Sequence, residues 1–275
     1  MANAVKPGTK VLVIDNGVYG FADLVRMYGG SPIAMGLNWR SPADPAVVDR
    51  WLEKEKDVEV ATLVHCDTPS AVYNQLWEIA RVTTSHGALL IVDAVSSIGA
   101  DEILFDQWRV GVLIGRSQKA LNAPPGLTIL AVSKAALDRA KEVGRETFYV
   151  NYFVWEDWLG EGGFPYTIPD VLLYVLKESL NKLLEEGVSS VFQRHKAARL
   201  AARRAAEALG LEPYSRCLEC NCPTATAFKS PVPPAQLRRY IWEKYGVLLA
   251  GSWGPLEGEV MRIGHMGCRH RLITL

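Results

Sequence analysis

The 275-residue sequence has no long apolar run and no excess of charge of either sign. No stretch approaches the roughly 18 to 20 consecutive apolar residues that a membrane-spanning helix needs, which argues against a contact with the membrane interior. Its 30 basic residues balance its 30 acidic ones, which gives no general attraction to nucleic acid or to an anionic membrane surface. The first residues also lack the apolar region of a secretory signal peptide, so we expect a cytoplasmic protein.

Cysteine is scarce as well. The five cysteines, at positions 66, 217, 220, 222 and 268, form an odd number in a long chain, which argues against a disulfide framework, and we expect them to be reduced. Cys217, Cys220 and Cys222 are close enough in sequence to suggest a soft metal site, but a zinc site needs a fourth ligand and no second ligand cluster is evident. Reduced cysteines in a turn before a strand are the favoured interpretation, and we predict no metal.

Short β-branched runs that alternate with helical patterns are abundant. Strand-like runs cover residues 10–15, 58–65, 88–92, 110–114 and 127–132, and helical patterns cover 45–55, 72–86 and 133–143. This alternation predicts βαβ units and therefore an α/β fold with a mostly parallel sheet. The segment 148–166, rich in aromatic residues, glycine and proline, is predicted to be a surface loop.

The C-terminal part of the chain has a different pattern. Two long helical patterns, at 170–186 and 189–209, each end just before a glycine. The remaining residues alternate strand and helix, which indicates a smaller α+β domain. We therefore predict a large domain over residues 1–168, and connecting helices with a small C-terminal domain over 169–275.

Two residues that can carry chemistry follow buried strand patterns. Asp93 closes the apolar run at 88–92, and Lys119 lies in a turn-rich segment shortly after the run at 110–114. A lysine at the end of a buried strand loses hydration, which lowers the pKa of its amine. An imine-forming lysine and a carboxylate that keeps a pyridine nitrogen protonated are what pyridoxal phosphate requires of a protein. The alternatives are an ordinary lysine at a strand end and a solvated aspartate.

Four motifs extend this pair over most of the chain. They are His65-Cys-Asp-Thr-Pro-Ser, Asp93-Ala-Val-Ser-Ser, Ser117-Gln-Lys-Ala-Leu-Asn-Ala-Pro-Pro-Gly and Arg262-Ile-Gly-His-Met-Gly. In spacing and order they resemble the class V pyridoxal-phosphate aminotransferases, nearest the alanine–glyoxylate and serine–pyruvate branch. The resemblance implies a type I pyridoxal-phosphate transferase fold, working as a homodimer with its active sites at the subunit interface.

The resemblance assigns the central roles residue by residue. Lys119 resembles the lysine that holds the cofactor as a Schiff base, and Asp93 resembles the partner of the pyridine nitrogen. Gln118 resembles the polar neighbour of that lysine. Arg262 matches the arginine that binds the substrate α-carboxylate, a role that suits a bidentate guanidinium.

Three hydroxyl residues are assigned in the same way. Thr68 and Ser70 fall in the hydroxyl-rich loop near the phenolic oxygen of the cofactor, although Pro69 and Ala71 vary that loop. Thr167 matches the threonine that reaches the cofactor phosphate of the other subunit.

The chain also departs from the family pattern. The glycine- and hydroxyl-rich turn that binds the cofactor phosphate near the N-terminus in the family has no counterpart, and the sequence after Cys268 stops short of the family's last helix, so we expect a truncated form. Gly115 and Arg116 replace a hydroxyl residue and a glycine before Ser117, and Arg116 could offer its charge to the phosphate. Phe164 stands where close relatives carry a tyrosine.

The function expected from the resemblance is transfer of an amino group from alanine or serine to glyoxylate or pyruvate, with pyridoxal phosphate as cofactor. A lyase on the same fold is an alternative, as is a non-catalytic, cofactor-deficient remnant of the family. A desulfurase needs a mobile catalytic cysteine, and none of the five lies in a recognisable version of that loop. A Rossmann dinucleotide site is disfavoured because the turn at 15–20 lacks the required glycine pattern.

Overall fold

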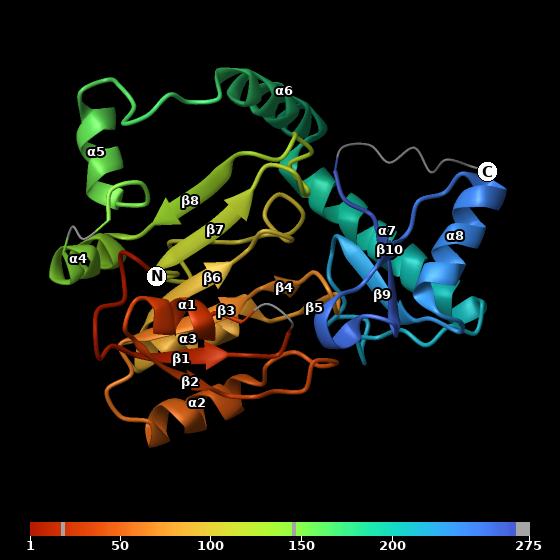
Figure 1. The fold of residues 1–275 in the computed structure, drawn as a ribbon, viewed down its shortest axis with the longest axis horizontal. Coiled ribbons are helices and arrows are strands. Elements are labelled where there is room, and N and C mark those ends of the chain that lie inside the picture. Colours follow the sequence, from red (N-terminus) through yellow and green to blue (C-terminus); the bar gives the residue numbers. More distant parts are fainter. Residues whose placement is uncertain (18–19, 145–146, 268–275) are drawn as a thin grey trace.

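A six-stranded sheet organises the N-terminal half of the protein (Figure 1). The computed structural model describes residues 1–17, 20–144 and 147–267. The strand order is β2-β1-β3-β6-β7-β8, and every neighbouring pair is parallel except β7 and β8. The strands are β1 (Lys10–Ile14), β2 (Ser31–Ala34), β3 (Val60–Val64), β6 (Leu89–Asp93), β7 (Val112–Arg116) and β8 (Thr128–Val132).

Helices cover both faces of this sheet, which explains why its strands are continuous apolar runs. Leu12 and Ile14 of β1 join a core cluster with α2 (Pro45–Lys54) and α3 (Leu76–Ser85). Val11 and Val13 point to the opposite face and join a second cluster, to which α1 (Ala22–Met27) and α4 (Lys134–Val143) contribute. The α/β fold with a mostly parallel sheet is thereby confirmed.

A smaller antiparallel sheet forms the C-terminal part, in the order β10-β11-β9. Its elements are β9 (Ala225–Lys229), α8 (Pro234–Tyr245), β10 (Ala250–Gly251), the 3₁₀ turn η1 (Gly254–Leu256) and β11 (Val260–Gly264). The helices α6 (Asp170–Glu186) and α7 (Val188–Ala208) lead to it. Figure 1 shows the carboxyl ends of the parallel strands pointing toward this second sheet. The division at residue 168 stays a prediction.

Two sequence-based expectations about local structure were wrong. The segment predicted as a loop contains the helix α5 (Tyr152–Gly160), which begins where the Asn151 side chain accepts a hydrogen bond from the Phe153 N–H at 2.9 Å. The helix predicted over 72–86 begins only at Leu76, because β5 (Val72–Tyr73) first pairs with β4 (Cys66–Asp67). The helix α1 and the strand β2 were not predicted.

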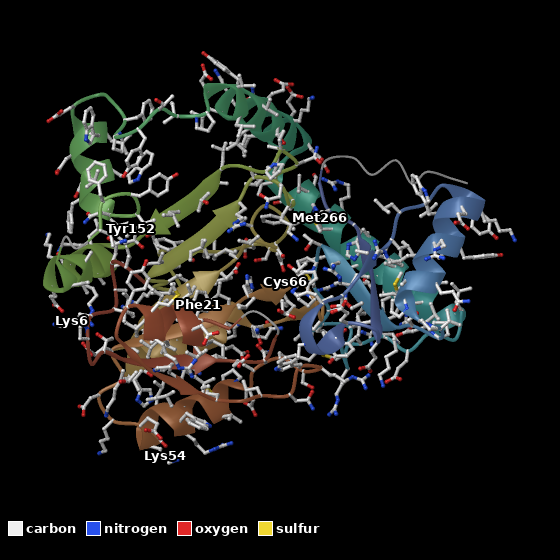
Figure 2. All side chains as sticks on the ribbon, in the orientation of Figure 1. Lys6, Phe21, Lys54, Cys66, Tyr152 and Met266 are labelled. Atoms are coloured by element: carbon white, nitrogen blue, oxygen red, sulfur yellow. A yellow bond between two sulfur atoms is a disulfide. The ribbon has the colours of Figure 1, made fainter. Side chains whose placement is uncertain are left out.

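The cysteines are paired, contrary to the expectation that they are reduced. Cys66 forms a disulfide with Cys222, and Cys217 forms one with Cys220. The first pair is 156 residues apart in sequence, so spacing alone could not reveal it. Figure 2 labels Cys66 where the large sheet meets the C-terminal part. Cys268 lies outside the described residues, as does the departure predicted for the chain end.

Within the described ranges, no three or more histidine, cysteine or acidic side chains are grouped so that they could hold a metal ion. The helices of those ranges include none that is long and apolar enough to cross a bilayer.

Candidate active site

Asp93 occupies the last position of β6, at the carboxyl end of the parallel sheet. It lies opposite Ile114 of the neighbouring strand β7, and its Oδ1 accepts a hydrogen bond from the Val95 N–H at 2.9 Å. Burial raises the pKa of the Asp93 carboxyl, while the Val95 hydrogen bond and the charges of Arg116 and Lys119 oppose that rise. The carboxylate can therefore accept a charged hydrogen-bond donor at this edge of the sheet.

Lys119 follows β7 after a turn, so two neighbouring strand ends supply the lysine and the aspartate, as predicted. The turn is fixed by a hydrogen bond from the Ser117 Oγ to the Pro124 carbonyl at 2.6 Å and by one from the Asn122 N–H to the Lys119 carbonyl at 2.9 Å. Burial lowers the pKa of the Lys119 amine, the positive charge of Arg262 lowers it further, and Asp93 opposes the shift. A larger fraction of the amine is neutral at a given pH than in an ordinary lysine.

Gln118 contributes a polar atom that the described part of the chain leaves without a partner. Its Oε1 is buried and makes no hydrogen bond there. Buried polar atoms in proteins are almost always hydrogen-bonded, so this amide indicates a place for a bound polar group beside Lys119. A carboxylate, an amine with a lowered pKa and an unsatisfied amide at one sheet edge fit pyridoxal phosphate.

The loop after β3 supports Asp67, an acidic group near Asp93 that sequence reasoning did not single out. Asp67 accepts hydrogen bonds from the Ser70 N–H at 3.0 Å and from the Ser70 hydroxyl at 2.5 Å. The Asp67 charge also helps to raise the pKa of Asp93. Thr68 is half-buried and its hydroxyl lies 2.5 Å from the Ser96 hydroxyl. Because the Ser70 hydroxyl is bonded to Asp67, a contact of Ser70 with the cofactor stays a prediction.

Arg262 on β11 reaches this loop from the C-terminal sheet. Its Nη1 donates a hydrogen bond to the Thr68 carbonyl at 3.1 Å, and its Nε donates one to the Gly251 carbonyl at 2.8 Å. The guanidinium also stacks on Trp253, with 4.5 Å between Cζ and the ring centroid. The positive charge of Arg262 lowers the pKa of the Lys119 amine, so the two side chains lie close enough to interact electrostatically.

The residues before Lys119 have an unusual composition that the structure accommodates. Gly115 is buried, and an added Cβ would lie 3.0 Å from the Ile98 methyl carbons, so a larger residue would have to displace Ile98. Arg116 is exposed at the end of β7, and its side chain makes no hydrogen bond or ion pair within the described ranges. Its guanidinium influences the pKa values of both Asp93 and Lys119.

Thr167 lies apart from these residues. It is exposed in the segment between α5 and α6, as is Phe164. Within the described part of the chain, neither side chain contacts Asp93 or Lys119 or affects the pKa of either. A role of Thr167 toward a second subunit therefore stays a prediction.

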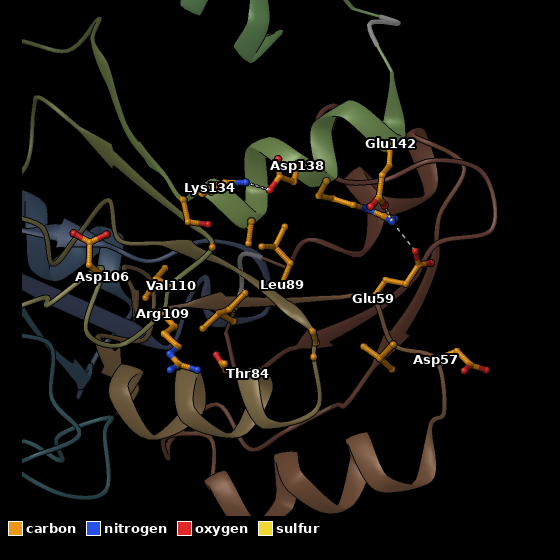
Figure 3. Close-up of a pocket in the computed structure, with 18 residues that line it drawn as sticks. Asp57, Glu59, Thr84, Leu89, Asp106, Arg109, Val110, Lys134, Asp138 and Glu142 are labelled. Atoms are coloured by element: carbon orange, nitrogen blue, oxygen red, sulfur yellow. Dashed lines mark hydrogen bonds and ion pairs between the residues drawn. The ribbon is translucent and has the colours of Figure 1, made fainter.

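A cavity of about 980 Å³ lies at the opposite, amino end of the strands (Figure 3). It includes none of the residues described above. An ion pair between Arg139 and Glu59, at 2.7 Å, and one between Lys134 and Asp138, at 2.5 Å, cross its wall. Since parallel α/β sheets place their chemistry at the carboxyl ends of strands, this cavity is not the active site.

Comparison with known proteins gives a single family. The model of the family described as "Aminotransferase class-V" matches residues 47–217. An uncharacterized aminotransferase of Methanocaldococcus jannaschii is 34% identical over 273 residues, which are 97% of this chain and 71% of that protein. A serine–glyoxylate aminotransferase of Methylorubrum extorquens is 33% identical over 288 residues, covering 100% of this chain and 72% of that protein.

Among solved structures, the pyridoxamine–pyruvate aminotransferase of Mesorhizobium loti superposes with a TM-score of 0.90 at 31% identity, covering 97% of this chain and 70% of that one. The aspartate and lysine at neighbouring strand ends, the family match and this shared fold lead to one conclusion. The chain belongs to the class V aminotransferases, whose cofactor is pyridoxal phosphate.

Proposed function

We propose that this protein transfers an amino group from a small amino acid, alanine or serine, to a 2-oxo acid, glyoxylate or pyruvate. The observation that carries the proposal is the pairing of Asp93 and Lys119 at the carboxyl ends of β6 and β7, with Arg262 close enough to affect the Lys119 amine. The names of similar proteins point to the same substrates, since they include serine–glyoxylate, alanine–glyoxylate and pyridoxamine–pyruvate aminotransferases.

The cofactor would be held by Asp93, Gln118, Thr68 and Lys119. Bound pyridoxal phosphate supplies an electron sink that weakens the bonds at the substrate α-carbon. Asp93 would accept a hydrogen bond from the pyridine nitrogen and would keep that nitrogen protonated. The Gln118 side chain, whose Oε1 has no partner among the described residues, would satisfy its hydrogen-bonding capacity on the bound cofactor.

The remaining steps belong to Lys119 and Arg262. The Lys119 amine removes the proton from the substrate α-carbon, and its lowered pKa suits this task because the neutral amine is the base. Arg262 binds the α-carboxylate with its guanidinium and so orients the bond that is broken.

Amino transfer tests this proposal directly. Purified protein with pyridoxal phosphate is incubated with alanine or serine and with glyoxylate or pyruvate, and the new amino acid is measured by chromatography. We expect turnover with at least one pair, and a loss of about 10²- to 10⁴-fold in Lys119→Ala. Absence of turnover with every pair, from protein that binds the cofactor, would contradict transamination.

A homodimer is the assembly we propose for this activity. Its support is a set of large apolar side chains exposed on α6 and on the segment before α5. They include Tyr174 at 73%, Val171 at 68%, Leu184 at 65%, Phe148 at 64% and Tyr149 at 72% exposure. Monomeric proteins rarely leave so many large apolar groups uncovered. In such a dimer, Thr167 on the adjoining segment would contact the phosphate bound by the other subunit.

We propose the cytoplasm as the compartment. Disulfides are rare there, but Cys66 and Cys222 are only 3% and 0% exposed, which shields the pair from glutathione. Cell fractionation followed by alkylation of free thiols tests both points: recovery in the soluble cytoplasmic fraction supports the proposal, and recovery outside the cytoplasm contradicts it.

A further inference from the structure

Among the described residues, Gly251, Thr68 and Trp253 contact the Arg262 guanidinium, and they come from two parts of the molecule. The Gly251 carbonyl accepts from its Nε at 2.8 Å, and the Thr68 carbonyl accepts from its Nη1 at 3.1 Å. Trp253 covers one face of the group, with 4.5 Å from its ring centroid to the Arg262 Cζ. Two hydrogen bonds and a ring lying under the guanidinium together restrict its position and its tilt.

Trp253 is placed for this contact by the strand it follows. The strand β10 ends at Gly251, opposite Met261 of β11, and the extended backbone of Trp253, at φ −147° and ψ 176°, continues away from it. The intervening Ser252 donates a hydrogen bond to the Pro69 carbonyl at 3.0 Å. The segment 251–253 therefore touches both Arg262 and the loop that carries Thr68.

The chemistry of this stack matters because carboxylate binding by arginine is directional. A guanidinium makes two parallel hydrogen bonds to a carboxylate only when the two groups are nearly coplanar. Arginine stacks well on indole, and the stack also keeps water from one face of the cation. A guanidinium that is already oriented loses less entropy when the carboxylate arrives.

We propose that Trp253 is a positioning residue for the substrate carboxylate, which sets the plane of the Arg262 guanidinium and thereby the affinity for amino acids and 2-oxo acids. This inference rests on the proposed function, in which Arg262 binds the α-carboxylate. It assigns no contact between Trp253 and the substrate. Loss of the ring leaves both hydrogen bonds of Arg262 in place, so we expect weaker carboxylate binding without loss of the fold.

Equilibrium binding of propionate tests the inference without turnover, because propionate has the carboxylate of alanine but no amino group. Calorimetry compares propionate with the uncharged propionamide in cofactor-loaded parent protein, Trp253→Leu and Trp253→Phe. We expect Trp253→Leu to weaken propionate binding by about 5- to 10-fold and to leave propionamide unchanged, with Trp253→Phe in between. In steady state, KM for alanine rises while kcat changes little.

Two further variants separate positioning from a general loss of structure. In the Arg262→Gln background, Trp253→Leu should cause no further loss of propionate affinity, because the group that the ring orients is gone. Trp242→Leu removes a tryptophan that is 56% exposed on α8 and should bind propionate like the parent.

Equal propionate affinity in parent and Trp253→Leu would overturn the inference, as would a parent that binds propionate no better than propionamide. If Trp253→Leu does not fold, Trp253→Phe decides, and parent-like binding together with a parent-like KM in that variant counts against the inference. The proposed function fails separately, if the parent binds no pyridoxal phosphate at Lys119.

Discussion

At the scale of single residues, the site depends on charges that act on one another across two strand ends. Loss of hydration and the positive charges of Arg262 and Arg116 lower the pKa of the Lys119 amine, while the negative charge of Asp93 raises it. Burial therefore gives the pKa shift its sign, and the neighbouring arginines increase its size. The same arrangement predicts how substitutions will change the titration of the amine.

The first prediction concerns the pH at which Lys119 becomes reactive. In cofactor-free protein, modification of Lys119 by an amine-directed reagent should show a midpoint below the ordinary lysine value of 10.5. Arg262→Gln removes a positive neighbour and should raise that midpoint, whereas Asp93→Asn should lower it. Mass spectrometry of the Lys119 peptide across a pH series gives the midpoints, and an upward shift in Asp93→Asn would contradict the account.

The second prediction concerns Arg116, which is exposed and has no ion pair among the described residues. We propose that its charge binds the cofactor phosphate, because it affects the pKa values of Asp93 and Lys119 from the end of β7. Arg116→Ala should weaken pyridoxal phosphate binding by about tenfold and leave pyridoxal, which lacks the phosphate, unaffected. Absorbance titrations with both ligands measure the difference.

Arg109→Ala is the matched control for Arg116, since Arg109 is exposed beside the cavity at the other end of the sheet (Figure 3). It should not change either affinity. Unchanged binding of pyridoxal phosphate by Arg116→Ala would show that Arg116 does not bind the phosphate.

At the scale of secondary structure elements, the sequence predicted what periodicity encodes. The apolar runs that became β1, β3, β6 and β7 were identifiable because most of their residues are buried in the sheet, and β8 was identifiable from its apolar run although it is partly exposed at the sheet edge. The helix α5 escaped prediction because its composition is aromatic and only Phe153 is buried, so no apolar stripe marks it. The start of α3 was misplaced because Val72 and Tyr73 form a strand that pairs with Cys66 and Asp67 just before it.

The residues of the candidate site also fall into two groups, those that the sequence predicts and those that only the structure reveals. Asp93 and Lys119 were predictable because both follow recognisable strands, and Arg262 because its motif is distinctive. Asp67 and Trp253 became apparent only from the structure, Asp67 through its charge effect on Asp93 and Trp253 through its contact with Arg262. The pairing of Cys66 with Cys222 belongs to this second group, since it joins β4 to the segment before β9.

The third prediction concerns this disulfide as a tether between the two sheets. Cys222→Ser should lower the free energy of unfolding by about 2 to 4 kcal/mol, because the long loop between the two cysteines is no longer closed in the unfolded chain. A reductant should lower the melting temperature of the parent much more than that of Cys222→Ser. Cys217→Ser should lower the free energy of unfolding by less than Cys222→Ser, because Cys217 and Cys220 are only 3 residues apart in sequence.

Calorimetry with and without reductant measures the melting temperatures of the parent and the variants. A Cys222→Ser variant that melts at the same temperature as the parent would show that the tether contributes nothing to stability.

At the scale of the whole molecule, the chain spans 71% and 72% of the two relatives compared above and retains their fold over its length. In the proposed dimer, the exposed apolar side chains of α6 are the surface on which a second copy would bind. A residue at the centre of such a surface contributes strongly when a charge replaces it, because the charge is buried without a partner.

The fourth prediction tests that surface. Tyr174→Glu should raise the dimer dissociation constant by more than about tenfold, as seen by sedimentation velocity over a range of protein concentrations. Tyr245→Glu, which alters an exposed tyrosine on α8, is the control and should sediment like the parent. A parent that is monomeric at every concentration would refute the proposed dimer.

The central claim is that Lys119 holds pyridoxal phosphate. The protein is incubated with equimolar cofactor, reduced with borohydride and digested, and the modified peptides are identified by mass spectrometry. The account predicts a single cofactor adduct on the peptide that contains Lys119, which disappears in Lys119→Ala. An unmodified Lys119 peptide, or adducts spread evenly over surface lysines, would contradict it.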